Sequence, residues 1–190
     1  IYDFPKGFEE YRNPGEVNAD LEKWAKEFSS IAKLESIGKT MENRDIWAMT
    51  VTGYKGLLTE NLVPGSLFVG NHHAREHLST EVALNTLHHI LENYGKDERI
   101  TNLVNNRIIY YIPQLNPDGT HHDLKGQDFQ MWRKNRRMFG SGWEKEVGVD
   151  LTSPVLGLGF VRQLVGIRLK ELSGELTRED GVIPTDPRYS

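Results

Sequence analysis

Apolar residues recur along the chain with two periods, one typical of helices and one typical of strands. The clearest helical spacing covers residues 78–94, where the apolar stripe consists of Val82, Ala83, Leu87, Ile90, Leu91 and Tyr94. A second helical stripe covers residues 14–28, and Asn13 followed by Pro14 is a typical helix start. A short helix is also expected over residues 98–105.

Strand patterns occupy much of the remaining sequence up to residue 112. Residues 44–52 alternate and are β-branched, and residues 107–112 are almost continuously apolar, as in a strand at the centre of a sheet. Shorter strands are expected at residues 31–37 and 67–70, the latter buried, and residues 116–119 (NPDG) predict a turn. The order helix, strand, strand, strand, helix, strand predicts an α/β domain with a mixed β-sheet flanked by helices.

Composition removes several function classes. The 190 residues suffice for one domain with a core, and a net charge of −4 gives no sign of nucleic-acid binding. No apolar run is long enough to cross a bilayer, and the absence of cysteine removes disulfides, thiolate zinc sites and cysteine nucleophiles. Because the chain starts with Ile1-Tyr2 and has no apolar signal region, we expect a processed or trimmed chain.

The seven histidines all lie between positions 72 and 122, and they are densest in the stretch GNHHAREHLS, residues 70–79. His73 and Glu76 are three residues apart, so on a helical turn their side chains point the same way. They follow a short strand and precede a long helix, which is where open α/β sheets build their sites. Since zinc accepts both imidazole nitrogen and carboxylate oxygen, one interpretation is a zinc site with His73 and Glu76 as ligands.

Two other interpretations of this cluster remain open. In the first, residues 73–77 form an H-x-x-E-H motif with His73 and His77 as ligands and Glu76 as general base. That motif belongs inside a helix, whereas Gly70 and a strand come directly before it here, so the His73–Glu76 site is favoured. In the second, histidines at a strand-to-helix turn only cap the helix and form hydrogen bonds.

Further motifs make the sequence resemble the zinc metallocarboxypeptidases of the carboxypeptidase A/B type, peptidase family M14, over about residues 8–151. The family's G-x-H-A-R-E matches residues 70–76, with one extra residue before the ligand histidine. Its NPDG turn, its W-R-K-x-R and the opening of its G-V-D-L-N-R-N follow in order at residues 116–119, 132–136 and 148–151. The resemblance implies zinc as cofactor and the removal of C-terminal amino acids from peptides.

The resemblance also implies roles for particular residues. His73 and Glu76 match the family's first two zinc ligands, and Arg75 matches an arginine that lines the substrate cleft. Arg133 matches the arginine that polarises the scissile carbonyl, a task suited to a permanently charged guanidinium. Asp150 matches a carboxylate that orients the ligand histidine. Outside this ordered set, Arg133 would be interpreted as a surface arginine and Asp150 as a turn residue.

The resemblance ends after Leu151. The family continues with Asn-Arg, which hold the C-terminal carboxylate of the peptide, whereas this chain continues with residues 152–155, TSPV. We therefore divide the chain into a carboxypeptidase-like part, residues 1–151, and a divergent tail, residues 152–190. A truncated gene product, intron read-through or a slip of the reading frame is the hypothesis for that tail.

Several parts of the family's site have no counterpart in the sequence. No histidine follows His122 to act as the third zinc ligand, and Tyr189 lacks the context of the family's substrate-closing tyrosine. The glutamates of the tail lack the context of its general base; these are Glu171, Glu175 and Glu179. The tail carries apolar residues at helical spacing between positions 161 and 176 that match no family element.

These gaps shape the expected function. Two protein ligands hold zinc weakly, because a catalytic site normally supplies three, and His72 or His77 would have to act as the third. We expect a zinc carboxypeptidase by type whose present chain has little or no peptidase activity, or alternatively a non-catalytic peptide- or metal-binding relative.

The expected partner is the C-terminus of a peptide or protein, with no nucleic-acid or membrane partner, and the resemblance alone favours a secreted or periplasmic location. A partial sheet with an unpaired strand predicts marginal solubility.

Overall fold

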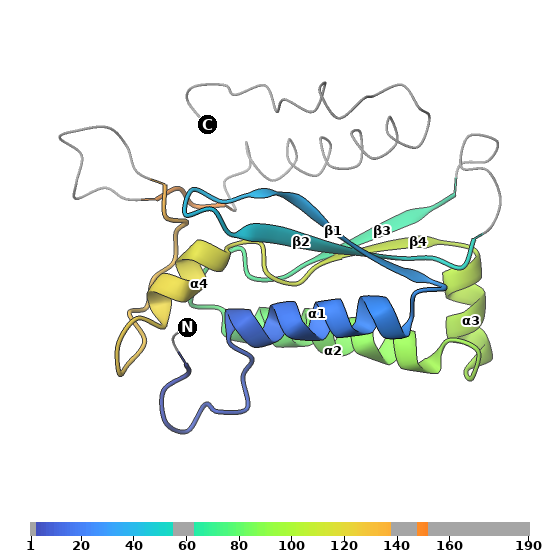
Figure 1. Ribbon diagram of the computed structural model, residues 1–190, viewed down its shortest axis with the longest axis horizontal. Helices are drawn as coiled ribbons and strands as arrows, with labels where there is room; N and C mark the ends of the chain where they lie inside the picture. Colours follow the sequence, from blue (N-terminus) through green and yellow to red (C-terminus); the bar gives the residue numbers. More distant parts are fainter. Residues whose placement is uncertain (1–2, 55–62, 138–147, 152–190) are drawn as a thin grey trace, which may run out of the picture. The chain divides into compact units, whose positions relative to one another are not determined.

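Eight helices and strands account for the regular structure of the described residues, which are 3–54, 63–137 and 148–151 of the computed structural model (Figure 1). All of these except Val63 and Leu151 belong to one unit made of residues 1–55 and 64–150. In chain order the elements are α1 (Pro14–Glu27), β1 (Ala32–Lys39), β2 (Asp45–Val51), β3 (Gly65–Val69), α2 (His77–Asn93), α3 (Glu98–Asn105), β4 (Ile108–Ile112) and α4 (Pro117–Asp123).

The four strands form one mixed sheet in the order β1-β2-β4-β3. β2 pairs antiparallel with β1 and with β4, whereas β3 pairs parallel with β4 from Gly65 opposite Ile108 to Val69 opposite Ile112. β4 therefore lies between two neighbours, and its residues are buried except for the half-buried Tyr110. The predicted α/β fold class with a mixed sheet and flanking helices, and the central position of this strand, are confirmed.

The core lies between the sheet and the helices that run along one of its faces, α1 and α2 (Figure 1). Trp24 and Leu21 of α1 and Leu87 of α2 are buried there against Met49 of β2 and Tyr111 of β4. Fully burying side chains of this size contributes about 1.5–3 kcal/mol each, so this layer supplies much of the stability that holds the strand ends in place.

The start of α1 follows the sequence prediction. The side chain of Asn13 accepts hydrogen bonds from the backbone N–H groups of Gly15 and Glu16, and the Glu16 carboxylate accepts one from the N–H of Asn13. This reciprocal capping box satisfies backbone donors that would otherwise lack partners at the helix start, and Pro14 contributes no donor there.

The buried face of α2 differs from the predicted apolar stripe at several residues, including the fully buried Leu84, which the stripe omitted. Val82, expected in the apolar stripe, is 57% exposed, whereas Glu81 is buried. Glu81 accepts hydrogen bonds from the backbone N–H and the guanidinium of Arg12, so its charge is paired inside the fold. That contact joins residues 69 positions apart, which is why helical spacing alone assigned the wrong neighbour to the core.

The strand expected to be buried at residues 67–70 is an edge strand. β3 has β4 on one side and no other strand beside it among the described residues, and Phe68 is 44% exposed. The prediction of burial was wrong because an apolar run reports a strand without reporting how many neighbours that strand has.

The NPDG stretch begins a helix, where a turn was predicted. Asn116 is the N-cap of α4 and accepts a hydrogen bond from the N–H of Gly119 at 3.1 Å, with Pro117 at the first helical position. The same residue types favour turns and helix starts, because both use a side-chain oxygen to satisfy a nearby backbone N–H.

Several predictions fall on residues outside the described ones. These are the amphipathic segment between positions 161 and 176, Tyr189, the glutamates of the tail, and the tail itself from residue 152 onward. Among the residues that the structure does describe, no helix combines the length and apolar character that a membrane span requires.

Candidate functional site

The histidine cluster lies in the connection from β3 to α2, at the carboxyl end of β3. Gly70, the first residue after the strand, donates its N–H to the carbonyl of Ile112 and accepts a hydrogen bond from the N–H of Leu115. A Cβ atom at this position would lie 2.5 Å from the carbonyl oxygen of Pro113 and 2.7 Å from that of Ser79. Only glycine fits here, and the close approach holds the connection against the end of β4.

Asn71 then shapes the turn that carries the predicted ligands. It is fully buried and has a φ of 55°, in the left-handed region that asparagine tolerates better than most residues. Its side-chain NH₂ donates to the carbonyls of His73 and Ala74, both at 3.2 Å, and its side-chain oxygen accepts from the Thr120 hydroxyl at 2.7 Å. Asn71 was not among the predicted site residues. An asparagine directly after a strand-ending glycine was the available signal.

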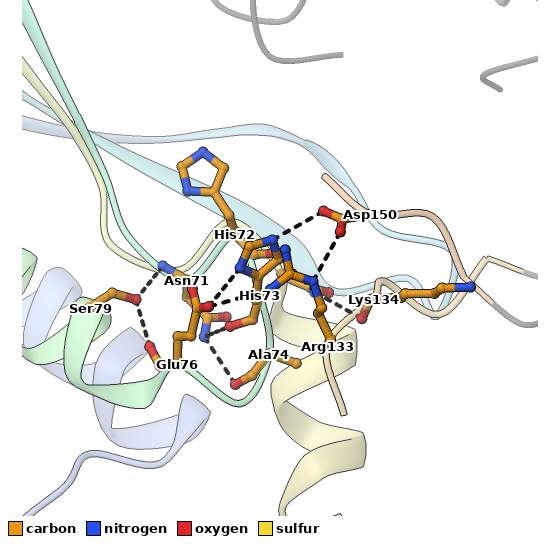
Figure 2. Close-up of polar contacts among 10 residues, drawn as sticks. Asn71, His72, His73, Ala74, Glu76, Ser79, Arg133, Lys134 and Asp150 are labelled. Carbon is orange, nitrogen blue, oxygen red and sulfur yellow. Dashed lines mark hydrogen bonds and ion pairs between the residues drawn. The ribbon is translucent and has the colours of Figure 1, made fainter. Parts of the chain in front are cut away.

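The structure brings four of the five predicted site residues together (Figure 2). His73 Nδ1 lies 2.8 Å from Glu76 Oε1, and His73 Nε2 lies 3.1 Å from Asp150 Oδ1. The other Asp150 oxygen accepts a hydrogen bond from Arg133 Nε at 3.0 Å, and Arg133 Nη1 lies 3.7 Å from Glu76 Oε1. One imidazole and one guanidinium are thus each placed between the same two carboxylates.

Backbone hydrogen bonds carry the two distant segments into the cluster. The N–H groups of Ala74 and Arg75 donate to the carbonyls of Arg133 and Trp132 at 3.1 and 2.9 Å, so the Arg133 segment pairs with the turn like a short strand. Asn135 exchanges contacts with Val149, donating its N–H to the Val149 carbonyl at 3.0 Å and accepting the Val149 N–H at its side-chain oxygen at 2.7 Å.

Gly148 makes this second pairing possible. It has a φ of +94°, and a Cβ atom there would lie 2.2 Å from the carbonyl oxygen of Asn135. The glycine of the GVDL motif therefore lets the backbone approach closely enough for Asp150 to reach both His73 and Arg133.

The cluster is open to solvent on its acidic side. The side chain of His73 is 8% exposed, whereas those of Glu76, Arg133 and Asp150 are 49%, 38% and 38% exposed. A ligand can therefore reach the carboxylates and the guanidinium, while the buried imidazole is held in place by its contact with Asp150.

Arg75, the fifth predicted residue, is placed differently. Its side chain is exposed, and within the described residues no hydrogen bond or ion pair joins that side chain to the other four. Its backbone nevertheless belongs to the site, because its N–H donates a hydrogen bond to the carbonyl of Trp132.

His77 lies apart from the cluster although it is only four residues from His73. It is the first residue of α2, is buried, and its Nε2 lies 2.8 Å from Asp123 Oδ2. Phe4 packs edge-on against its ring and Phe129 stacks on it, with centroid distances of 4.9 and 5.3 Å. Because Glu76 precedes α2 and His77 begins it, residues 73–77 do not form the helical turn that the H-x-x-E-H alternative requires.

His72 is also directed away from the His73–Glu76 contact (Figure 2). Burial lowers the pKa of His72, and the neighbouring His73 lowers it further, against a smaller opposite effect of Glu76. In the part of the chain that the structure describes, no group of three or more His, Asp or Glu side chains is arranged to hold a metal ion. The described residues therefore provide two facing donor groups of the kinds that zinc accepts, the His73 imidazole and the Glu76 carboxylate.

Comparison with known proteins gives a consistent family. The family model described as zinc carboxypeptidase matches residues 17–153. A zinc carboxypeptidase of Saccharothrix mutabilis subsp. capreolus is 36% identical over 135 residues, which are 71% of this chain and 31% of the relative. An inactive metallocarboxypeptidase of Saccharomyces cerevisiae is 29% identical over 159 residues, covering 76% of this chain and 36% of that protein.

Solved structures agree with these relatives. The crystal structure of thrombin activatable fibrinolysis inhibitor superposes with a TM-score of 0.65 and 25% identity, and the match covers 74% of this chain and 33% of that one. The chain thus spans about a third of the length of the relatives described here. Over the matched residues, the chain belongs to the zinc carboxypeptidase family.

Proposed function

We propose that residues 1–151 form the N-terminal part of a zinc-dependent carboxypeptidase site, acting on the C-terminus of a peptide or protein. His73 and Glu76 hold the zinc ion, Asp150 orients His73, Arg133 polarises the carbonyl of the scissile bond, and Arg75 lines the substrate cleft. When bound, zinc lowers the pKa of a water molecule and polarises the substrate carbonyl.

One observation carries this proposal: the two ring nitrogens of His73 face two different carboxylates. Nδ1 faces Glu76 at 2.8 Å and Nε2 faces Asp150 at 3.1 Å. A metal-binding histidine commonly offers one nitrogen to the ion while a carboxylate holds the other, which fixes the ring and raises its basicity. The geometry supports Nδ1 and the Glu76 carboxylate as the pair that binds zinc, with Asp150 behind them.

Arg133 has the surroundings that oxyanion stabilisation needs. Its backbone is held by the turn, its Nε–H is held by Asp150, and its guanidinium lies at the exposed side of Glu76. A guanidinium that is already oriented requires little reorganisation as negative charge develops on the carbonyl oxygen.

The chain as given is proposed to have weak or no peptidase activity. Two protein ligands are one fewer than a catalytic zinc site uses, and the sequence has no histidine after His122 and no Asn-Arg after Leu151. Without that arginine, the carboxylate of the peptide loses its bidentate partner.

The test is a calorimetric titration of the metal-free chain with zinc. The wild-type chain should bind one zinc ion weakly, and His73→Ala and Glu76→Ala should each lower the affinity by about tenfold or more. Equal affinity in all three proteins would refute the ligand assignment. Release of C-terminal amino acids at about 1 s⁻¹ or faster would refute the proposed loss of activity.

A second candidate function is a non-catalytic module that binds peptides. The match to an inactive metallocarboxypeptidase over 76% of this chain favours it, since the family includes members without activity. A peptide-binding assay with Glu76→Gln separates the two functions. A module should still bind the peptide when this carboxylate is replaced, whereas binding through a zinc ion should be lost.

The divergent tail is proposed to result from a change in the coding sequence. The family match reaches residue 153, close to the position where Thr152 replaces the family's Asn. Reading the coding DNA in all three frames from the Asp150 codon tests this. Asn-Arg in another frame, followed by a histidine, a tyrosine and a glutamate in family order, would support a frame slip. Their absence from every frame would refute the frame slip and favour a truncated relative.

A further inference from the structure

Asp123 is a buried carboxylate whose two oxygens both have partners. It is the last residue of α4, and its side chain is fully buried. One oxygen, Oδ2, lies 2.8 Å from His77 Nε2, and the other, Oδ1, accepts a hydrogen bond from the backbone N–H of Trp132. It therefore ties the start of α2 to the segment that carries Arg133.

The surroundings of this pair keep water away from it. The ring of His77 is packed against Phe4 and Phe129, and His77 itself is only 9% exposed. A hydrogen bond to a charged acceptor in such a low-dielectric setting is stronger and more sensitive to geometry than the same bond in water.

Asp123 completes a set of contacts that holds the backbone of residues 132–134 at successive atoms. The carbonyls of Trp132 and Arg133 accept from Arg75 and Ala74, and the carbonyl of Lys134 accepts from the side-chain NH₂ of Asn116 at 3.0 Å. The same segment also donates one hydrogen bond: the N–H of Trp132 donates to the side chain of Asp123. The position of the Arg133 Cα atom is thus fixed on both sides, one of them by a buried charge.

We propose that Asp123, supported by His77, is a positioning residue that aims the Arg133 guanidinium at Glu76 and Asp150. This inference rests on the proposed function of Arg133 as the group that polarises the substrate carbonyl. It assigns His77 a role in the site without making it a metal ligand: its ring holds Asp123, which in turn holds the backbone beside Arg133.

The test measures the hydrogen exchange of the Arg133 Nε–H and of the Trp132 amide by NMR, in the full chain without zinc. Arg12 provides an internal control, because its Nε–H donates to Asp20 at 2.7 Å and its other partner is Glu81, so among the described residues it forms hydrogen bonds with neither Asp123 nor Trp132 nor Arg133. With Asp123→Leu, the exchange at both Trp132 and Arg133 should accelerate by about tenfold, while Arg12 is unchanged. Asp123→Asn should restore most of the protection, since its side-chain oxygen can still accept from Trp132 and its NH₂ can donate to a neutral His77.

Asp118 offers the matched control variant. It is another buried carboxylate on α4, only 3% exposed, but its partners are Thr40, the N–H of Glu42, and Arg44. Asp118→Leu should lower the stability of the fold and leave the exchange at Arg133 unchanged. An equal acceleration at Arg133 in Asp118→Leu and Asp123→Leu would overturn the proposal, because the effect would then be general destabilisation.

His77→Gln keeps the test decisive if Asp123→Leu does not fold. The milder variant should accelerate exchange at Trp132 and Arg133 more than at Arg12, because Asp123 loses its second anchor. Unchanged exchange at Arg133 in His77→Gln and in every folded Asp123 variant would overturn the proposal. Zinc affinity is measured separately on the wild-type chain, so a chain that binds no zinc but shows the expected exchange pattern would reject the proposed function and leave the positioning role intact.

Discussion

His73 and His77 lie four residues apart, and each one pairs with an aspartate far away in the sequence. The partner of His73 is Asp150, 77 positions away, and the partner of His77 is Asp123, 46 positions away. The partners differ in their surroundings: the Asp150 side chain is 38% exposed, whereas that of Asp123 is fully buried. A histidine–aspartate pair therefore does not define a metal site by itself.

What surrounds each ring, apart from its aspartate, distinguishes the two histidines. Nδ1 of His73 faces the carboxylate of Glu76, which is open to solvent and close to the guanidinium of Arg133. The ring of His77 is packed against aromatic side chains. The two rings are about equally buried, but His73 has a second carboxylate partner that solvent reaches, as a metal site needs, whereas His77 has aromatic neighbours, as a structural contact needs.

The largest expected effect is on folding stability, and it should fall on His77. His77→Ala leaves the buried Asp123 without its hydrogen-bond partner and opens a cavity beside Phe129, so we expect the free energy of unfolding to fall by about 3 kcal/mol. His73→Ala should cost about 1 kcal/mol, because its partners are exposed and water can replace the lost contacts. Urea unfolding of both variants measures this. Equal losses would abolish the contrast between the two histidines.

Zinc affinity should respond in the opposite order. His73→Gln should weaken zinc binding about a hundredfold, since one of only two protein ligands is lost, whereas His77→Gln should leave the affinity within about threefold. Calorimetric titration on folded samples of both variants gives the comparison. Loss of zinc binding in His77→Gln would instead favour the H-x-x-E-H alternative.

Variants of the two aspartates test the same difference between the histidines, through a smaller change in zinc affinity. Asp150→Asn should weaken zinc binding about tenfold, because the amide holds the His73 ring but no longer raises its basicity. Asp123→Asn should leave the zinc affinity nearly unchanged, since Asp123 contacts His77 and Trp132 and neither is a proposed ligand. A larger loss with Asp123→Asn than with Asp150→Asn would contradict the assignment of Asp150.

A further effect, similar in size to that of Asp150→Asn, is the stabilisation of the fold by the metal. Zinc at ten times its dissociation constant should raise the free energy of unfolding by about 1.4 kcal/mol, and a chelator should reverse this. His77→Gln should keep this gain although its starting stability is lower, and His73→Ala should lose it. Thermal unfolding with and without zinc provides the measurement, and a zinc-dependent gain in His73→Ala would show that the ion binds elsewhere.

Local sequence patterns predicted most elements of the fold because their signals are short in range. Three examples are the capping residue Asn13, the helical stripe of α2 and the apolar run of β4. Each signal depends only on residues nearby in the same helix or strand. The errors at Glu81, Val82 and Phe68 have the opposite origin. Each depends on a partner, or on the lack of one, in a distant part of the chain.

The candidate site divides in the same way. The sequence by itself determined which residues carry the zinc carboxypeptidase motifs and their order, because residue type and spacing are written along the chain. Only the tertiary structure decided that Asp150 meets His73, that Asp123 meets His77, and that Asn71 and Gly148 shape the backbone between them. Contacts between residues 46 to 77 positions apart have no period that a sequence can display, since the packing of the sheet and helices brings them together.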